Sequence, residues 1–141
     1  MGEGLTYDNL IEAVQLDELY VADLSCKRVK DVIDWPLKVD IEFRPGEPTI
    51  VEGAIVAYPK FVFQAISEKT EEETLRVEVV WRLVYTLEGR TVDDFDEGLI
   101  RQFFERNIPI NVWPQARMMI TFLTSEMGLP PFVLPVYKIT R

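Results

Sequence analysis

The chain has 141 residues, of which 48% are hydrophobic and 11% aromatic; this is enough for one domain with a buried core and too little for two. Twenty-four acidic residues against 15 basic ones give a formal net charge of −9. A surface of this sign repels nucleic acid and anionic membranes, which excludes both as expected partners and favours basic or mixed-charge ones.

The sequence contains no histidine and a single cysteine, Cys26. Without histidine, the usual general base near neutral pH, the usual zinc ligand and the Ser-His and Cys-His nucleophile pairs are all missing. One cysteine excludes an internal disulfide and a cysteine-rich zinc site, and we expect it to be buried or half-buried. Carboxylate-only chemistry stays formally open, but no pattern indicates it. We therefore expect a protein that is not an enzyme, with no catalytic residue, no cofactor and no metal.

The first residues, MGEGLTYDNLIEAV, lack the basic and apolar regions of a signal peptide. No apolar run approaches the roughly 20 residues that a bilayer crossing needs. We therefore expect a cytoplasmic protein with no membrane insertion.

Strand patterns dominate the first part of the chain. Thr6–Leu10 fits a short turn or helix. Ala13–Lys27 is predicted to be a strand with a bulge near Asp17–Glu18, because the apolar positions shift there by one residue. Lys27–Asp34 has no clean period and is predicted to be a connecting loop that leads to Trp35.

Three further strands are predicted before the helices begin. Leu37–Arg44 alternates strictly between apolar and charged residues and ends at the turn signal Pro45–Pro48. Thr49–Ala57 is either a short edge strand or an insertion, and Tyr58–Ser67 is another strand. Thr74–Glu88 is a long strand. Its inner series is Leu75, Val77, Val79, Trp81, Leu83, Tyr85 and Leu87.

An acidic cluster precedes the first helical pattern. Asp93–Asp96 and Glu97 stand at the start of a short helix over Leu99–Phe104 that ends before Pro109. The cluster lacks the spacing of a calcium loop, and carboxylates at a helix start are explained by capping and the helix dipole. We therefore interpret it as structural.

The main helix is predicted between Pro114, which suits a first turn, and Gly128, which suits the position after the last turn. At about 100° per residue, Met118 and Phe122 fall on the side opposite to its apolar stripe. The stripe consists of Ala116, Met119, Ile120, Leu123 and Met127. A helix that is apolar on two sides needs a partner besides its own sheet.

The order of strands first and helices last predicts an α+β fold, with an antiparallel sheet and helices on one face. We find no repeat, low-complexity tract or linker, so a single domain over residues 1–141 is expected. The long strand and the two-sided helix expose more apolar surface than one layer covers, which predicts a homo-oligomer with closed symmetry.

The stretch Asn107–Pro135 resembles the carboxy-terminal motif of the SecB family of cytosolic export chaperones. The matching residues are Pro114-Gln115-Ala116-Arg117, Gly128-Leu129-Pro130-Pro131 and Leu134-Pro135. Upstream, Leu19–Ser25 is similar to the family's first strand, Asp34-Trp35 to the tryptophan of its crossover loop, and Leu83–Gly89 to the end of its long strand.

This resemblance implies a four-stranded antiparallel sheet with a crossover loop and one long C-terminal helix packed on one face. It also implies a homotetramer built as a dimer of dimers. Clients would bind unfolded, in an apolar groove formed by Trp35, Met118 and Phe122. The implied subunit interface consists of Val77, Val79, Trp81, Ile120 and Leu123.

The resemblance also bears on docking to the SecA motor. Asp23 and Glu78 match acidic positions that face SecA, whereas Lys27 stands where another acid is expected. The sequence given stops at Arg141, before the second C-terminal helix and acidic tail that contribute to this docking. Partnership with SecA is therefore left open.

The leading hypothesis is an ATP-independent holdase that binds unfolded or newly made polypeptides, for protein export or for a dedicated client such as an antitoxin. The first alternative is a small-ligand-binding α+β module without chaperone activity, with polar groups converging on a closed cavity. The second is an assembly subunit that oligomerises without binding clients.

Overall fold

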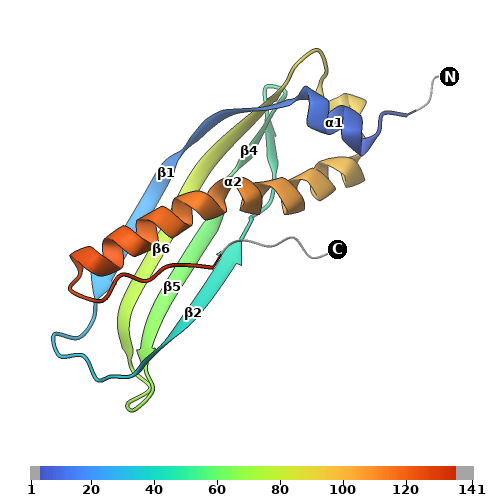
Figure 1. Ribbon diagram of the computed structural model, residues 1–141. Helices are drawn as coiled ribbons and strands as arrows, with labels where there is room; N and C mark the ends of the chain where they lie inside the picture. Colours follow the sequence, from blue (N-terminus) through green and yellow to red (C-terminus); the bar gives the residue numbers. More distant parts are fainter. Residues whose placement is uncertain (1–3, 136–141) are drawn as a thin grey trace.

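The computed structural model describes residues 4–135, which form one antiparallel sheet with a long helix on one face (Figure 1). In chain order the elements are α1 (Tyr7–Ala13), β1 (Val14–Arg28), β2 (Leu37–Arg44), β3 (Thr49–Val51), β4 (Ala54–Ala57), β5 (Lys60–Ser67), β6 (Glu73–Leu87), the 3₁₀ turn η1 (Val92–Asp94) and α2 (Glu97–Glu126). No helix within residues 4–135 combines the length and apolarity that a membrane crossing requires.

The sheet has six strands rather than the four expected, because prolines divide two of the four expected strands into two shorter ones each. Strand β6 is central, with β1 along one edge and β5 and β4 end to end along the other. Pro59, which has no N–H, separates β4 from β5. The ladder nevertheless continues past this break, since the N–H of Trp81 donates to the carbonyl oxygen of Pro59 at 3.1 Å.

The outermost strand position of the sheet, occupied by β2 and β3, is interrupted in the same way. Strand β2 pairs with β5, and β3 pairs with β4, so Pro45–Pro48 joins two collinear strands instead of reversing the chain. The reversal comes at Glu52 and Gly53, whose φ angles are +49° and +81°. Thr49–Ala57 is therefore a β-hairpin, and its β4 arm belongs to the sheet that packs on α2.

Strand β1 contains the expected irregularity and one more. Its register against β6 shifts between Leu16 and Glu18, as the sequence predicts, and again between Val21 and Asp23. Each shift returns the following apolar residues to the face that carries α2. The strand thus keeps a mostly apolar helix-side face along its whole length.

Helix α2 is a single element of 30 residues, whereas the sequence predicts two helices separated near Pro109. Pro109 and Pro114 each remove one backbone hydrogen bond, but the apolar face runs on through both positions. Burial of this continuous face against the sheet holds the two halves together. The buried apolar residues on it are Ile100, Phe103, Phe104, Ile108, Pro109, Val112, Ala116 and Ile120.

The end of α2 agrees with the sequence. Gly128 has a φ angle of +79°, its N–H donates to Ser125 O at 3.2 Å, and the N–H of Leu129 donates to Thr124 O at 3.0 Å. This is the pair of bonds that defines a Schellman motif. The motif directs the chain back along the helix that it has just left.

Candidate functional site

After α2 the chain returns alongside the helix as an extended segment, Leu129–Pro135, here called the strap (Figure 1). Four side chains of α2 bond to the backbone of the strap. The bonds run from Trp113 Nε1 to Pro135 O (2.6 Å), from Arg117 Nε to Leu134 O (3.0 Å), from Thr121 Oγ1 to Phe132 O (2.9 Å), and from Phe132 N to Thr124 Oγ1 (2.9 Å). These residues follow one another at helical spacing, so one stripe of the helix fixes the strap.

Side chains of the strap also pack into the core. Leu134 is fully buried and Leu129 is 8% exposed. The ring of Phe132 lies against that of Phe63 on β5, with centroids 5.1 Å apart. The strap is thereby placed over the sheet between α2 and the outer strands, with a hollow on each side of it.

The first hollow, here called the loop groove, lies between the strap and the segment from β1 to β2. It has a volume of about 200 Å³ and is lined mainly by apolar residues. They are Trp35, Leu37, Val39, Phe63, Ala65, Leu75, Thr124, Leu129, Pro130, Pro131 and Phe132. Trp35 is 48% exposed, so its ring forms an open rim of this groove.

The second hollow, here called the helix groove, lies between the strap and the solvent side of α2. It has a volume of about 520 Å³ and its lining residues are Arg117, Met118, Thr121, Phe122, Ser125, Pro131 and Val133. Met118 and Phe122 are 63% and 61% exposed, which is unusual for large apolar side chains. Pro131 lines both grooves, so the two hollows meet at the strap.

The three residues expected in one groove are therefore divided. Trp35 lines the loop groove, whereas Met118 and Phe122 line the helix groove. The strap that separates them was not predicted from the sequence. Its signal was available in the polar stripe Trp113, Arg117, Thr121 and Thr124, which follows helical spacing beside the apolar one.

Residues 29–36, which link β1 to β2 and carry Trp35, are anchored to the turn between β5 and β6. Lys30 Nζ lies 2.5 Å from Glu72 Oε2, and the N–H of Glu68 donates to Pro36 O at 2.9 Å. The hydrogen bond with Glu72 raises the pKa of Lys30. The wall of the loop groove is thus tied to the sheet near both of its ends.

The residues expected at a subunit interface lie mostly inside the chain itself. Val77, Val79 and Ile120 have no exposed surface, and Trp81 is 1% exposed, because α2 covers their face of β6. Leu123 is half-buried at the margin of the same core. The burial of the first four therefore requires no second copy of the chain.

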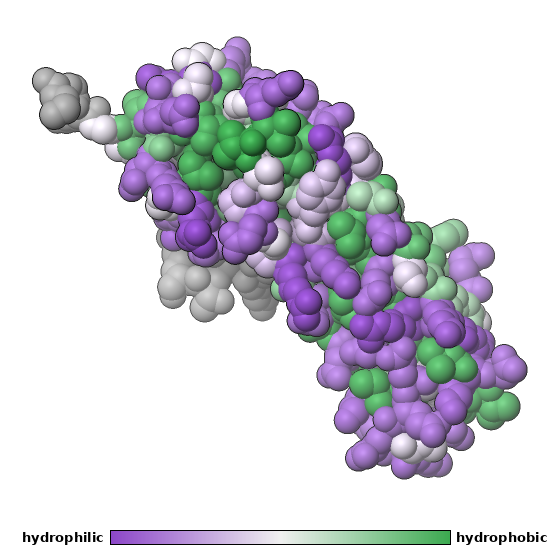
Figure 2. All heavy atoms as spheres, turned by 180° about the vertical axis from the view of Figure 1, so that it is seen from behind, coloured by the Kyte–Doolittle hydropathy of each residue, from purple (hydrophilic) through white to green (hydrophobic). Residues whose placement is uncertain are grey.

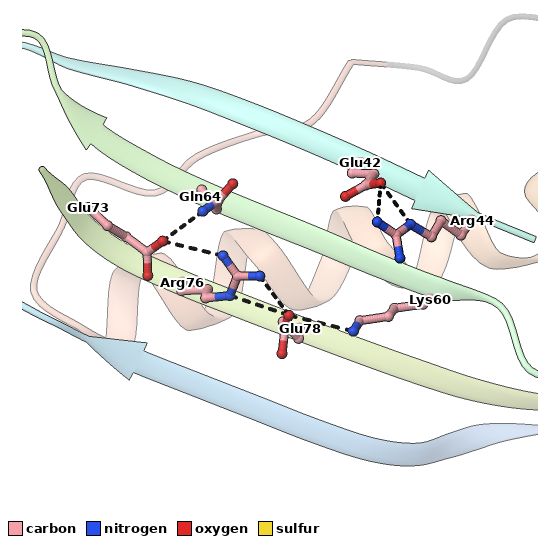
Figure 3. Close-up of polar contacts among 7 residues, drawn as sticks. All are labelled: Glu42, Arg44, Lys60, Gln64, Glu73, Arg76 and Glu78. Carbon is pink, nitrogen blue, oxygen red and sulfur yellow. Dashed lines mark hydrogen bonds and ion pairs between the residues drawn. The ribbon is translucent and has the colours of Figure 1, made fainter. Parts of the chain in front are cut away.

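The face of the sheet opposite α2 carries the two residues expected to face SecA. Asp23 is exposed, whereas Glu78 bonds to Arg76 Nη2 at 2.8 Å and lies 3.6 Å from Lys60 Nζ (Figure 3). The hydrogen bond from Arg76 holds the pKa of Glu78 below its usual range.

Other charges on this outer face are paired in the same way. Arg76 also contacts Glu73, which accepts a bond from Gln64, and Arg44 bonds to Glu42 (Figure 3). Figure 2 shows this face as mainly hydrophilic, with hydrophobic residues gathered toward the end nearer the N-terminus. The outer face therefore presents charges of both signs, several of which are paired with one another.

The acidic cluster before α2 is explained only in part by capping, because the Asp96 side chain makes no capping hydrogen bond to α2. Asp94 Oδ2 accepts a bond from the N–H of Thr91 at 2.8 Å, and Asp96 is the residue before the first turn of α2. Within residues 4–135, no group of three or more His, Cys, Asp and Glu side chains is arranged to hold a metal ion.

No family model and no curated protein matches the sequence. The structure does match that of the SecB-like chaperone Rv1957 of Mycobacterium tuberculosis, determined in complex with a ChAD peptide from the HigA1 antitoxin. The TM-score is 0.77 at 15% sequence identity, with 95% of this chain and 97% of that chain covered. A Streptococcus agalactiae protein of unknown function gives a TM-score of 0.42 at 12% identity, covering 87% of this chain and 97% of that one, which is too low to support an argument. The first match shows that the chain has the SecB-like fold.

Proposed function

We propose that this chain, which has the SecB-like fold, is an ATP-independent holdase that binds unfolded or newly made polypeptides in the two grooves. Trp35 in the loop groove, and Met118 and Phe122 in the helix groove, are the client-binding residues of this proposal. Binding only to unfolded chains shifts their folding equilibrium without any covalent step. The chain itself then needs no catalytic residue.

The observation that carries the proposal is the pair of open apolar grooves along the strap. Large apolar side chains are costly to leave in water, and covering one stabilises a complex by about 1.5–3 kcal/mol before the cost of ordering the client. Three such side chains spread over two grooves suit an extended client better than a small compact ligand. They also suit weak, reversible binding, as a holdase requires.

Suppression of aggregation tests the proposal directly. A denatured test protein is diluted into buffer with and without this chain, and light scattering is followed at increasing molar ratio. We expect Trp35→Ala and Phe122→Ser to lower the suppression. Ile50→Ser and Ile110→Ser are matched controls, since these residues are 47% and 41% exposed and line neither groove. Scattering that is unchanged by an excess of the wild-type chain contradicts the proposal.

Within this function we propose a dedicated client, of the antitoxin kind, in preference to general export through SecA. Two observations support this choice: the neighbour in fold is complexed with an antitoxin peptide, and Glu78 is paired with Arg76 and Lys60. Docking through Asp23 and Glu78 would compete with those pairs. Purified SecA titrated into this chain should give no binding heat, and salt-sensitive binding would instead favour export.

We also propose that the chain assembles, as a dimer or as a tetramer of two dimers, through the helix-side face of β1. Leu16, Val21 and Leu24 pair in register with Tyr85, Trp81 and Val79, so their side chains lie on the face that carries α2. They remain 40–44% exposed, whereas the contacts of β1 with the end of α2 lie further along the strand, at Cys26 and Arg28. A second copy is an occupant that would cover all three.

A further inference from the structure

Arg28, the last residue of β1, connects the two segments that form the walls of the loop groove. Its Nε donates to Lys30 O at 3.0 Å and its Nη2 to Asp31 O at 2.8 Å, both at the start of the loop that carries Trp35. Its Nη1 donates to Met127 O at 2.8 Å, at the end of α2. One half-buried guanidinium is therefore bonded to both walls.

The position of these bonds matters for the groove. Arg28 is opposite Leu75 in the sheet, and Leu75 lies at the bottom of the loop groove. Met127 is two residues before Leu129, where the strap begins, and Leu129 lines the other wall. A shift at Arg28 would thus move the beginnings of both walls relative to the floor between them.

An arginine is well suited to this place. All three acceptors are main-chain carbonyl oxygens in three directions, and a planar guanidinium offers five fixed donors where a lysine ammonium is a single compact point. The carbonyl of Met127 also lies at the negative end of the α2 dipole, which favours a cation. Gly128 adds a steric argument, since a Cβ atom there would lie 2.9 Å from Arg28 Nη1.

A neighbouring contact fixes the same junction without charge. Cys26 Sγ lies 3.0 Å from Met127 Sδ, and burial raises the pKa of the Cys26 thiol, so the pair stays neutral. This contact joins β1 to the helix end but does not reach the loop. Arg28 is the residue with bonds to both.

We propose that Arg28 is a positioning residue, which sets the distance between the Trp35 wall and the strap and thereby the affinity of the loop groove for clients. The inference rests on the proposed holdase function. It predicts that client affinity responds to the geometry of the guanidinium and not only to its charge.

The test compares Arg28→Met, which removes the guanidinium, with Arg28→Lys, which keeps the charge and loses the fork. Arg82→Met is the matched control, because Arg82 bonds to Glu18 and Tyr58 on the outer face. Three quantities are measured in the full chain: the Kd for reduced, carboxymethylated α-lactalbumin, the midpoint of thermal unfolding, and acrylamide quenching of tryptophan fluorescence with Trp35→Phe as background.

We expect Arg28→Met to weaken the Kd about tenfold and to change the quenching of Trp35, with Arg28→Lys between it and the wild type. Arg82→Met should leave both quantities unchanged. If Arg28→Lys restores neither the Kd nor the quenching, the whole effect depends on the forked geometry of the guanidinium, which also supports the proposal. Full rescue by Lys would assign it to charge alone and overturn it.

Two other results would overturn the proposal. One is an unchanged Kd in Arg28→Met. The other is a loss of affinity that follows the loss of thermal stability equally in the Arg28 and Arg82 variants. If the wild-type chain binds no client, the holdase function has failed, whereas the quenching of Trp35 still reports whether Arg28 places the loop.

Discussion

Tyr85 and Glu78 show how the two faces of β6 treat ionisable groups differently. Tyr85 is 1% exposed beneath α2, and burial raises its pKa to about 12, although the hydrogen bond from Asn111 Nδ2 at 2.7 Å acts in the opposite direction. Glu78 lies on the outer face, where Arg76 lowers its pKa. The stability of the fold is therefore expected to depend on alkaline pH through one face of β6 and on acidic pH through the other.

The first prediction concerns alkaline stability. The pKa of Tyr85 is raised in the folded state. Its contribution to the free energy of unfolding is therefore complete below the ordinary pKa of 10 and is lost as the pH rises through about 12. Urea unfolding at increasing pH should show a loss on the order of 2–3 kcal/mol across this window from this residue. Tyr85→Phe should flatten the curve there. An equally steep loss in the variant would contradict the assignment.

The second prediction concerns acid. Because the pKa of Glu78 is lowered by Arg76 first, its contribution is present above the ordinary value of 4.5 and is lost as the pH falls through the lowered value. The pair is partly exposed, with 29% and 39% of the side-chain surface in water, so the effect should be small and decrease with salt. Chemical unfolding of Glu78→Gln, measured from neutral to acidic pH, checks this. A loss of stability toward acidic pH as steep as that of the wild type would refute it.

At the scale of elements, the sequence predicted most where side-chain period and backbone agree. Leu37–Arg44 has the predicted bounds because its alternation is strict, and Gly128 ends α2 because the αL position favours glycine. Pro109 misled the prediction, since local preference for a break was weaker than burial of one continuous helix face. The prediction of a turn at Pro45–Pro48 was also wrong, because two prolines interrupt the hydrogen bonds between strands whether or not the chain reverses there.

The candidate site was less accessible to sequence reasoning. Trp35, Met118 and Phe122 could be singled out as large residues in polar surroundings, and all three line open grooves. The polar stripe of α2 could have indicated a second partner for the helix, but the path of the strap could not be derived, because it depends on hydrogen bonds between residues that only the folded chain brings together. Arg28 gave no signal either, since its partners are backbone atoms with no sequence pattern.

A third prediction tests how the strap is held to α2. Thr124 is 3% exposed and accepts the N–H of Phe132, whereas Thr121 donates to the carbonyl of the same residue at a half-buried position. Thr124→Val leaves a donor without its acceptor, which costs about 1–3 kcal/mol, and Thr121→Val should cost less. Urea unfolding and hydrogen exchange of the Phe132 amide measure both. Equal costs would mean that burial does not distinguish the two bonds.

The fourth prediction concerns the end of α2. At Gly128 the φ angle of +79° and the nearby Arg28 Nη1 both disfavour a side chain. Gly128→Ala should destabilise the fold by about 1–2 kcal/mol in chemical unfolding. Gly98→Ala, in the first turn of the same helix, has room at 3.4 Å from Asp96 Oδ2 and should be neutral or stabilising by up to about 1 kcal/mol. Similar effects at both sites would argue against the strain.

At the scale of the whole molecule, the apolar surface is distributed on two sides of α2. The grooves lie on the side of the strap, and Leu16, Val21 and Leu24 lie on the side of β1. Assembly through β1 would therefore leave the grooves open. Client binding and self-association can then be changed separately by mutation.

The fifth prediction uses this separation. Leu24→Lys places a charge on the helix-side face of β1 and should reduce the molar mass in solution, measured by light scattering, towards that of one chain. Ser25→Lys adds the same charge on the outer face of the same strand, opposite Glu78, and should leave the molar mass unchanged. A wild-type chain that is monomeric at all concentrations would remove the proposed assembly.

The composition of the strap has a consequence for release. Three of its seven residues, Pro130, Pro131 and Pro135, have no N–H, and the amides of Leu129 and Phe132 are already donated to Thr124. At most two amides remain with which a visiting chain could form strand-like pairing. A guest lying along the strap would therefore be held there mainly by its side chains, and it could leave the strap quickly because few backbone hydrogen bonds would have to break.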